Sequence, residues 1–134
     1  MNWIINSCRI SGRQNEIQML SNNIFYIGFG TLEEERHKKK TNTTIKQFNT
    51  FIQKAKKGDN IYLYANKVGI IAIGEFTGDY YNPICNEEKA PDWGVEHYQC
   101  HVKVTKWNKI YPPLKYKPRP LTLYLDNLFQ KKLI

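Results

Sequence analysis

The histidines and carboxylates are the side chains of this sequence that could carry acid–base or metal chemistry. His97 and His101 are four residues apart in a stretch that alternates polar and apolar residues, which predicts a strand. On a strand the two imidazoles face the same side about 13 Å apart, too far to share a metal ion. The sequence contains no Walker loop, HExxH motif or nucleophile elbow. The pattern therefore predicts no catalytic residue and no metal site.

Three carboxylates, Asp59, Glu75 and Asp79, are the remaining candidates for a metal cluster. Asp59 and Asp79 each follow a glycine, where an aspartate commonly hydrogen-bonds the backbone of a turn. Cys85 has no evident partner for nucleophilic chemistry. The chain has 3 cysteines without CxxC spacing, which indicates a reducing compartment rather than disulfides or zinc. We therefore favour structural roles for these residues and expect no cofactor.

Aromatic side chains near glycines and prolines are stronger candidates, and the chemistry they offer is stacking. Phe29 lies between two glycines, and Trp93 lies in a polar loop with prolines. Tyr80 and Tyr81 follow a Gly-Asp turn, and strand alternation predicts that one points inward and the other outward. A pocket of Phe29, Trp93 and one of these tyrosines would hold a flipped or single-stranded base. Alternatively, Trp93 covers the end of a barrel, and most aromatic residues fill the core.

Positive charge is the main feature of the composition. The 134-residue chain has a formal net charge of +8 and a pI of about 9.4, which favours a polyanionic partner, nucleic acid before membrane, although solubility alone could also explain it. The side chains expected to contact phosphates are Arg36, Lys38, Lys39, Lys40, Lys103 and Lys106. Charge runs such as 32–42 are usually solvated loops or frayed helices, and the alternative is a basic edge that meets phosphates. No apolar run is long enough to cross a membrane.

Hydrophobic periodicity predicts the elements that would position these side chains. A helix is clearest over 43–57, where Ile45, Phe48, Ile52 and Ala55 share one face. The other expected segments are strands at 2–9, 24–29, 60–65, 68–77 and 98–107, a loop with at most one helical turn at 11–23, and a strand followed by a helix at 121–134. Together they predict one α+β domain over residues 1–134. We expect a closed or nearly closed β-barrel of five or six strands with one or two helices at its side.

Short motifs follow one another along most of the chain. They are Trp3-Ile4-Ile5-Asn6, Ile27-Gly28-Phe29-Gly30, Phe48 with Phe51, Lys57-Gly58-Asp59, Ile73-Gly74-Glu75, Thr77-Gly78-Asp79-Tyr80, and His101 with Trp107. In order and spacing they resemble the PUA-like superfamily, in particular the EVE, YTH and McrB N-terminal types of domain. Phe29 stands where the version found beside restriction endonucleases has tryptophan. The resemblance implies a small pseudo-barrel that binds DNA or RNA, often with a modified base held in an aromatic cage.

The expected function is therefore a non-enzymatic nucleic-acid-binding module. DNA and RNA both remain open as ligands, as does a homo-oligomer. The alternative is a protein-interaction or structural module, for example a virion or inhibitor component, and a small enzyme using Glu75 or Asp79 ranks third. No signal peptide is visible, so an intracellular location is expected. Abundant Asn, Lys and Ile are typical of AT-rich genomes such as those of large DNA viruses, for which a virion or viral factory would be the location.

Overall fold

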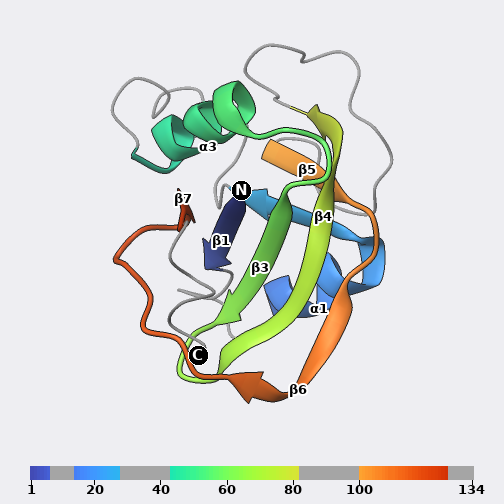
Figure 1. Cartoon of the computed structure of the whole chain (residues 1–134), viewed down its shortest axis with the longest axis vertical. Helices are drawn as coiled ribbons and strands as arrows, with labels where there is room; N and C mark the ends of the chain where they lie inside the picture. The colour runs from blue at the N-terminus through green and yellow to red at the C-terminus, as the bar shows by residue number, and fades with distance from the viewer. Residues whose placement is uncertain (7–13, 28–42, 82–99, 127–134) are drawn as a thin grey trace.

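One long strand organises the structure. The computed structural model describes residues 1–6, 14–27, 43–81 and 100–126, and in it β4 (Gly69–Tyr81) pairs with β3, β5 and β6 (Figure 1). The other described elements are β1 (Asn2–Asn6), α1 (Gln14–Asn22), β2 (Ile24–Ile27), α3 (Thr43–Lys54), β3 (Asn60–Ala65), β5 (Cys100–Val104), β6 (Asn108–Leu114) and β7 (Leu123–Leu125). This combination confirms the predicted α+β class.

All the described strands belong to one mixed sheet, in the order β2-β5-β4-β3-β1-β7, with β6 also paired to β4. β1 and β3 run parallel, and the other pairs are antiparallel. β6 pairs with the first part of β4, and β5 pairs with the last part, where Tyr80 lies opposite Val102. The register shifts between Phe76 and Tyr80, and Gly78 lies within this irregularity at φ +94°. Glycine adopts that backbone conformation without strain, so it suits the irregularity in the β4–β5 pairing.

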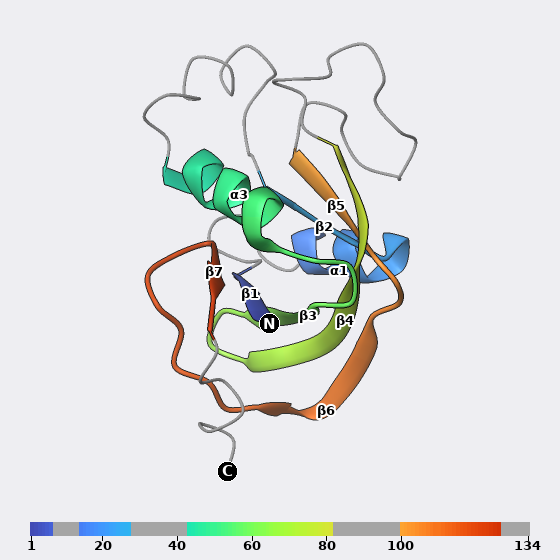
Figure 2. The ribbon, with the colours of Figure 1, turned by 45° about the horizontal axis from the view of Figure 1, so that its top comes forward.

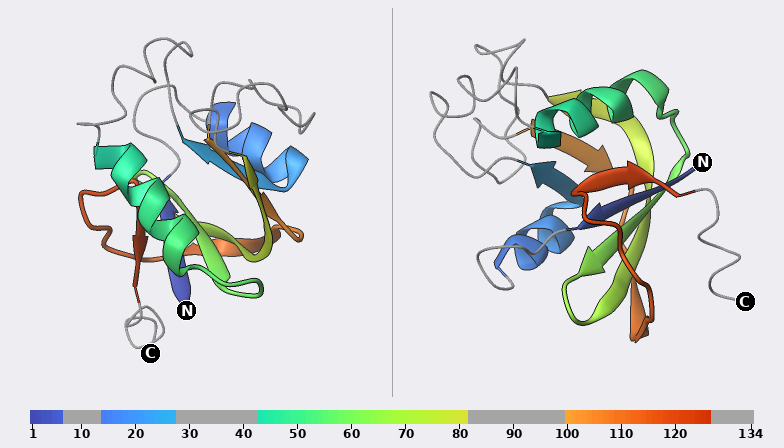
Figure 3. Two further views of the ribbon diagram at one scale, coloured as in Figure 1. Left: turned by 90° about the horizontal axis from the view of Figure 1, so that it is seen from above. Right: turned by 90° about the vertical axis from the view of Figure 1, so that its left-hand side faces the viewer.

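The sheet is curved but open, so the prediction of a closed or nearly closed barrel is wrong for the described residues. β2 and β7 are the two ends of the sheet, and no described strand pairing joins them (Figures 2 and 3). At β7 the side chain of Gln47 on α3 stands where another strand would pair. Its Oε1 accepts hydrogen bonds from the N–H groups of Thr122 and Leu123, each at 2.9 Å. A helix side chain therefore satisfies part of an edge that a barrel would close with a strand.

Helix α1 occupies residues for which the sequence predicted a loop. Met19 on this helix is buried, Leu20 is half-buried against the core, and Ile17 remains exposed. Gln18 Oε1 also accepts a hydrogen bond from the hydroxyl of Tyr26 on the following strand, at 2.9 Å. The helix is short and polar, and it is stabilised by packing on β2, which local periodicity does not reveal.

Helix α3 covers one face of the sheet, and its apolar stripe faces the sheet as predicted. Phe48 and Phe51 are fully buried, and their core includes Ile61 and Leu63 of β3. The intervening tyrosines of β3 lie in a second core on the opposite face. That core contains Ile4, Tyr62, Tyr64, Ile70 and Tyr124. The predicted alternation of β3 is therefore confirmed, because each of its faces is buried against a different set of residues.

Asp59 ties the turn before β3 to β1. Its Oδ2 accepts hydrogen bonds from Trp3 Nε1 at 3.2 Å and from the backbone N–H of Lys56 at 3.0 Å, and its Oδ1 accepts one from the Met1 amino group at 3.2 Å. Burial by itself raises the pKa of this carboxyl, but these donors outweigh burial and hold the pKa below its ordinary value. The turn role predicted for Asp59 is confirmed, and the same carboxylate also anchors the first strand.

We expect Asp59→Asn to lower the free energy of unfolding by about 1–3 kcal/mol near neutral pH, because hydrogen bonds to a carboxylate are lost. The depressed folded-state pKa stabilises the fold fully above the unfolded-state value of about 3.9, and this stabilisation is lost as pH falls through the folded-state pKa. Urea denaturation from neutral pH down to about pH 3 should therefore show the difference from wild type shrinking. Asp79→Asn, which changes an exposed carboxylate, should stay within about 0.5 kcal/mol. A wild-type to Asp59→Asn difference that does not change with pH would contradict this assignment.

Candidate nucleic-acid interface

The predicted base-binding residues are neighbours in sequence of one end of the sheet, the end formed by β2, β4 and β5. Ile27 at the end of β2 pairs with Cys100, and Tyr81 at the end of β4 pairs with His101. The predicted residues Phe29, Arg36, Lys38, Lys39, Lys40 and Trp93 lie outside the described residues. The chain positions that flank them, at 27, 81 and 100, are nevertheless brought together by the strand pairing. The segment 28–42 therefore begins at this end of the sheet, and the segment 82–99 begins and ends there.

The two tyrosines at this end have different exposures, as strand alternation predicts. Tyr80 is 46% exposed, and its ring lies edge-on to Phe48 of α3 with the centroids 6.4 Å apart. Tyr81 is only 4% exposed and lies beside His101, with ring centroids 5.7 Å apart. Of these two tyrosines, Tyr80 is therefore the one that offers a ring to a ligand. The inclusion of Tyr81 as a base contact does not fit its burial, because a buried ring has no free face to stack on.

The two predicted phosphate contacts in the described part of the chain lie further along the sheet. Lys103 on β5 is half-buried, and its Nζ donates a hydrogen bond to the carbonyl of Asn22 at 3.1 Å. Lys106 is exposed in the turn after β5. It is six residues beyond Cys100, or about 20 Å if that stretch were fully extended. Lys106 and the attachment points of the predicted pocket therefore lie at different ends of β5, a separation that only an extended ligand could bridge.

Three further residues of the resemblance motifs are structural. The indole of Trp107 is buried and donates a hydrogen bond from Nε1 to the carbonyl of Ile24 at 3.1 Å. His101 is fully buried in β5. Gly74 lies against this tryptophan, because a Cβ at that position would stand 3.2 Å from Trp107 Cε3 and would overlap Val104. These motif positions therefore hold strands together and do not offer contacts to a ligand.

Charge is distributed unevenly between the surface and the interior of the described residues. Glu16, Asp59 and Asp126 are buried, and Asp126 accepts a hydrogen bond from the Tyr116 hydroxyl at 2.7 Å. Glu75 and Asp79 are the acidic residues that remain exposed in the described ranges. The exposed cationic residues of the same ranges are Lys46, Lys54, Lys56, Lys57, Lys67, Lys106, Lys109, Lys115, Lys117 and Arg119. The surface of the described residues is therefore more one-sidedly basic than their composition indicates, because folding buries three of their carboxylates.

Metal and membrane features are not found in the described ranges. Within 1–6, 14–27, 43–81 and 100–126, no three His, Cys, Asp or Glu side chains are grouped so that they could hold a metal ion. No helix within those ranges has the length and apolar character needed to cross a bilayer. The carboxylate of Asp59, one of the residues considered for a metal cluster, is instead engaged by Trp3 and Lys56.

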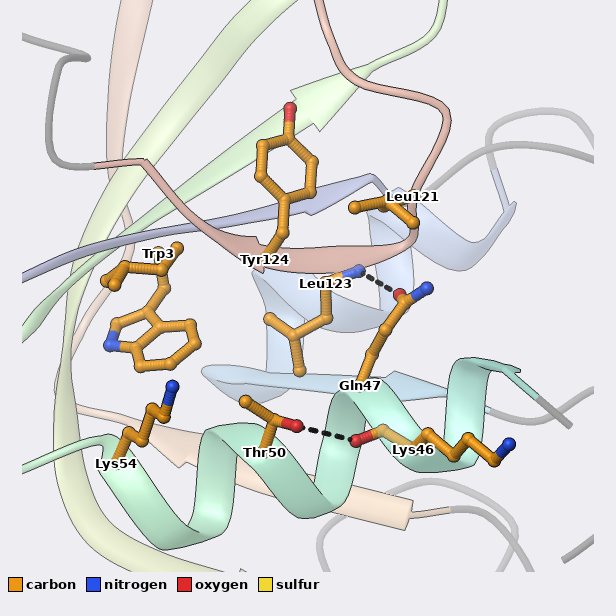
Figure 4. Close-up of a pocket in the computed structure, with 9 residues that line it drawn as sticks. Trp3, Lys46, Gln47, Thr50, Lys54, Leu121, Leu123 and Tyr124 are labelled. Carbon is orange, nitrogen blue, oxygen red and sulfur yellow. Dashed lines mark hydrogen bonds between the residues drawn. The ribbon is translucent and has the colours of Figure 1, made fainter. Parts of the chain in front are cut away.

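The sequence did not predict a groove that opens between α3 and β7 (Figure 4). It has a volume of about 260 Å³. The residues that line it are Trp3, Lys46, Gln47, Thr50, Lys54, Leu121, Leu123, Tyr124 and Leu125. Sequence periodicity predicted that the face of α3 with Phe48 and Ile52 is buried, and it made no prediction for the face with Lys46 and Lys54. The available signal was the four-residue spacing of Lys46, Thr50 and Lys54, which places them in one stripe along the helix.

Comparison with known proteins identifies a family for the chain. No curated protein sequence matches it. A family model does match residues 3–118, from β1 to the segment that follows β6. That match spans most of the described sheet and includes α1 and α3. The chain therefore belongs to the family described as Domain of unknown function (DUF8426).

Proposed function

We propose that this protein is a non-enzymatic module that binds DNA or RNA. The observation that carries the proposal is the charge distribution, in which the exposed charged residues of the described ranges are mostly lysines while most described carboxylates are buried. Exposed ammonium groups neutralise phosphates and release their counterions, and this release drives most sequence-independent binding. Buried carboxylates such as Asp59 and Asp126 do not face an approaching phosphate. The motif resemblance to the PUA-like superfamily supports the same class of ligand.

Base recognition is the second part of the proposal. Tyr80 exposes its ring at the end of the sheet from which the segments containing Phe29 and Trp93 are connected. Together these three aromatic residues would stack on one unpaired base, and a modified base is the preferred candidate from the motif resemblance. Arg36, Lys38, Lys39 and Lys40 belong to the same connecting segments and would contact the adjoining phosphates.

Fluorescence anisotropy with labelled oligonucleotides tests the proposal directly. Single-stranded DNA, duplex DNA and RNA would each be titrated, with and without methylated bases, over a range of salt concentrations. We expect binding whose logarithmic affinity falls linearly with the logarithm of salt concentration, with a slope of about −0.7 to −0.9 for each phosphate contacted. Absence of salt-dependent binding to every oligonucleotide would overturn the proposed function.

We expect Tyr80→Ala to weaken binding of single-stranded oligonucleotides by about 5- to 150-fold, because stacking contributes about 1–3 kcal/mol per base. The matched control is Tyr111→Ala, since Tyr111 is 95% exposed but lies on β6, which pairs with the opposite part of β4. Its loss should change affinity by less than about twofold. Equal losses in the two variants would show that Tyr80 has no special role, and no loss in either would remove the stacking pocket from the proposal.

A further inference from the structure

The groove between α3 and β7 combines an apolar lining with a basic rim (Figure 4). Leu123 points from β7 toward the helix, and Thr50 lies opposite it at the middle of the groove. Lys46 and Lys54 are exposed and lie toward the two ends of the helical stripe. None of the lining residues is acidic. An occupant of this groove should therefore be apolar at its centre and negatively charged on either side.

The backbone of β7 adds a second requirement on the occupant. The N–H of Asn6 donates to the carbonyl of Thr122 at 2.8 Å, and the N–H of Asp126 donates to the carbonyl of Asn2 at 2.9 Å. With Trp3 opposite Leu125 and Ile5 opposite Leu123, antiparallel geometry directs the backbone groups of Leu123 and Leu125 away from β1. Among the described residues β1 is the strand neighbour of β7, so these groups form a sheet edge.

Gln47 shows that this edge accepts a hydrogen-bonding partner. Its side-chain carbonyl takes the N–H of Leu123 at 2.9 Å, as the carbonyl of an adjacent strand would. Within the described ranges Gln47 is the partner of the Leu123 N–H, and the Leu125 N–H and the two leucine carbonyls continue the edge beside the groove. A ligand with N–H and C=O groups at strand spacing matches these positions, and an extended polypeptide is such a ligand.

We propose that the β7 edge and its groove bind an extended acidic segment of a partner protein by strand addition. Lys46 and Lys54 are eight residues apart, which is about 12 Å along a helix. Four residues of a strand span about 13 Å, and side chains at alternate positions share one face. The matching segment therefore has acidic residues at positions i and i+4 and an apolar residue at i+2. The acidic side chains meet the two lysines, and the apolar side chain enters the groove beside Leu123. This inference does not depend on nucleic-acid binding.

The test uses a short end-blocked peptide with the core Glu-Thr-Leu-Thr-Glu, titrated into the full chain labelled with ¹⁵N. We expect chemical-shift changes at the backbone amides of Leu123 and Leu125 and at the side-chain amide of Gln47. Two comparison peptides carry Lys in place of both Glu residues, or N-methyl groups at the backbone positions that face β7. Both should bind at least about tenfold more weakly, because charge or strand hydrogen bonds are lost.

The paired variants are Lys46→Glu with Lys54→Glu, and Lys115→Glu with Lys117→Glu as a control of equal charge change on exposed residues. The first pair should weaken the acidic peptide at least about tenfold and make the lysine peptide the better ligand, whereas the control should stay within about twofold. The proposal is overturned if the Leu123 and Leu125 amides do not shift, or if the N-methylated peptide binds equally well. It is also overturned if a thymidine oligonucleotide shifts the same amides and displaces the peptide, because the groove would then belong to nucleic acid.

Discussion

Replacing Phe51 with alanine is expected to lower the free energy of unfolding by about 3–5 kcal/mol. Phe51 is fully buried, and its ring meets aromatic rings from three different strands. The centroid distances are 4.9 Å to Trp3 of β1, 5.5 Å to Phe25 of β2 and 5.0 Å to Phe76 of β4. Truncation removes these edge-to-face contacts and leaves a cavity in the middle of the core, which surrounding strands fill only in part.

Urea denaturation followed by far-UV circular dichroism measures this loss. The matched control is Gln53→Ala, because Gln53 lies on the same helix and is exposed. It should change the free energy of unfolding by less than about 0.5 kcal/mol. A loss below about 1 kcal/mol for Phe51→Ala would mean that α3 does not cover the sheet as described. Truncating a buried phenylalanine in contact with three strands lowers the free energy of unfolding by more than this.

The second large effect concerns the charged run at 32–42. Changing Arg36, Lys38, Lys39 and Lys40 together to glutamate is expected to weaken oligonucleotide binding by more than about 100-fold at moderate salt. If each residue contacts one phosphate, the slope of log affinity against log salt should also decrease in magnitude by about 3. Both quantities come from the same anisotropy titrations at several salt concentrations.

Four exposed lysines from the described ranges provide a control with the same change in net charge. The control variant changes Lys57, Lys67, Lys115 and Lys117 to glutamate. Because the overall field is reduced equally, it should lose some affinity but keep the larger part of the salt slope. If the two variants lost affinity and slope to the same extent, net charge would explain the binding and the run at 32–42 would have no specific role.

Local patterns predicted the elements in which the spacing of apolar residues marks the buried face. The helix spacing of Phe48, Ile52 and Ala55 correctly indicated the buried side of α3. Strand alternation in β3 correctly separated Ile61 and Leu63 from Tyr62 and Tyr64. The same patterns missed α1 and β6, since α1 is a polar helix and β6 contains two prolines that read as an irregular extended segment. Helix α1 forms because it packs on β2, and β6 forms because it pairs with β4.

Local patterns also could not predict those features of the candidate site that depend on contacts between distant segments. Alternation predicted that one of Tyr80 and Tyr81 points outward, and only the packing of Tyr81 beside His101 identifies Tyr80 as the exposed one. The groove could not be predicted, because it requires β7 to pair with β1 and α3 to lie beside β7. These pairings join residues more than 60 positions apart in the chain.

The sequence by itself determined the α+β class, the faces of α3 and β3, the turn role of Asp59 and the excess of positive charge. These properties follow from residue type and local spacing, which a chain carries before it folds. Only the tertiary structure decided that the sheet stays open, that Glu16 and Asp126 leave the surface, and that a basic-rimmed groove forms beside β7. The physical reason is that burial and strand order depend on contacts between distant segments, and the net charge of a sequence does not say which charges the solvent meets.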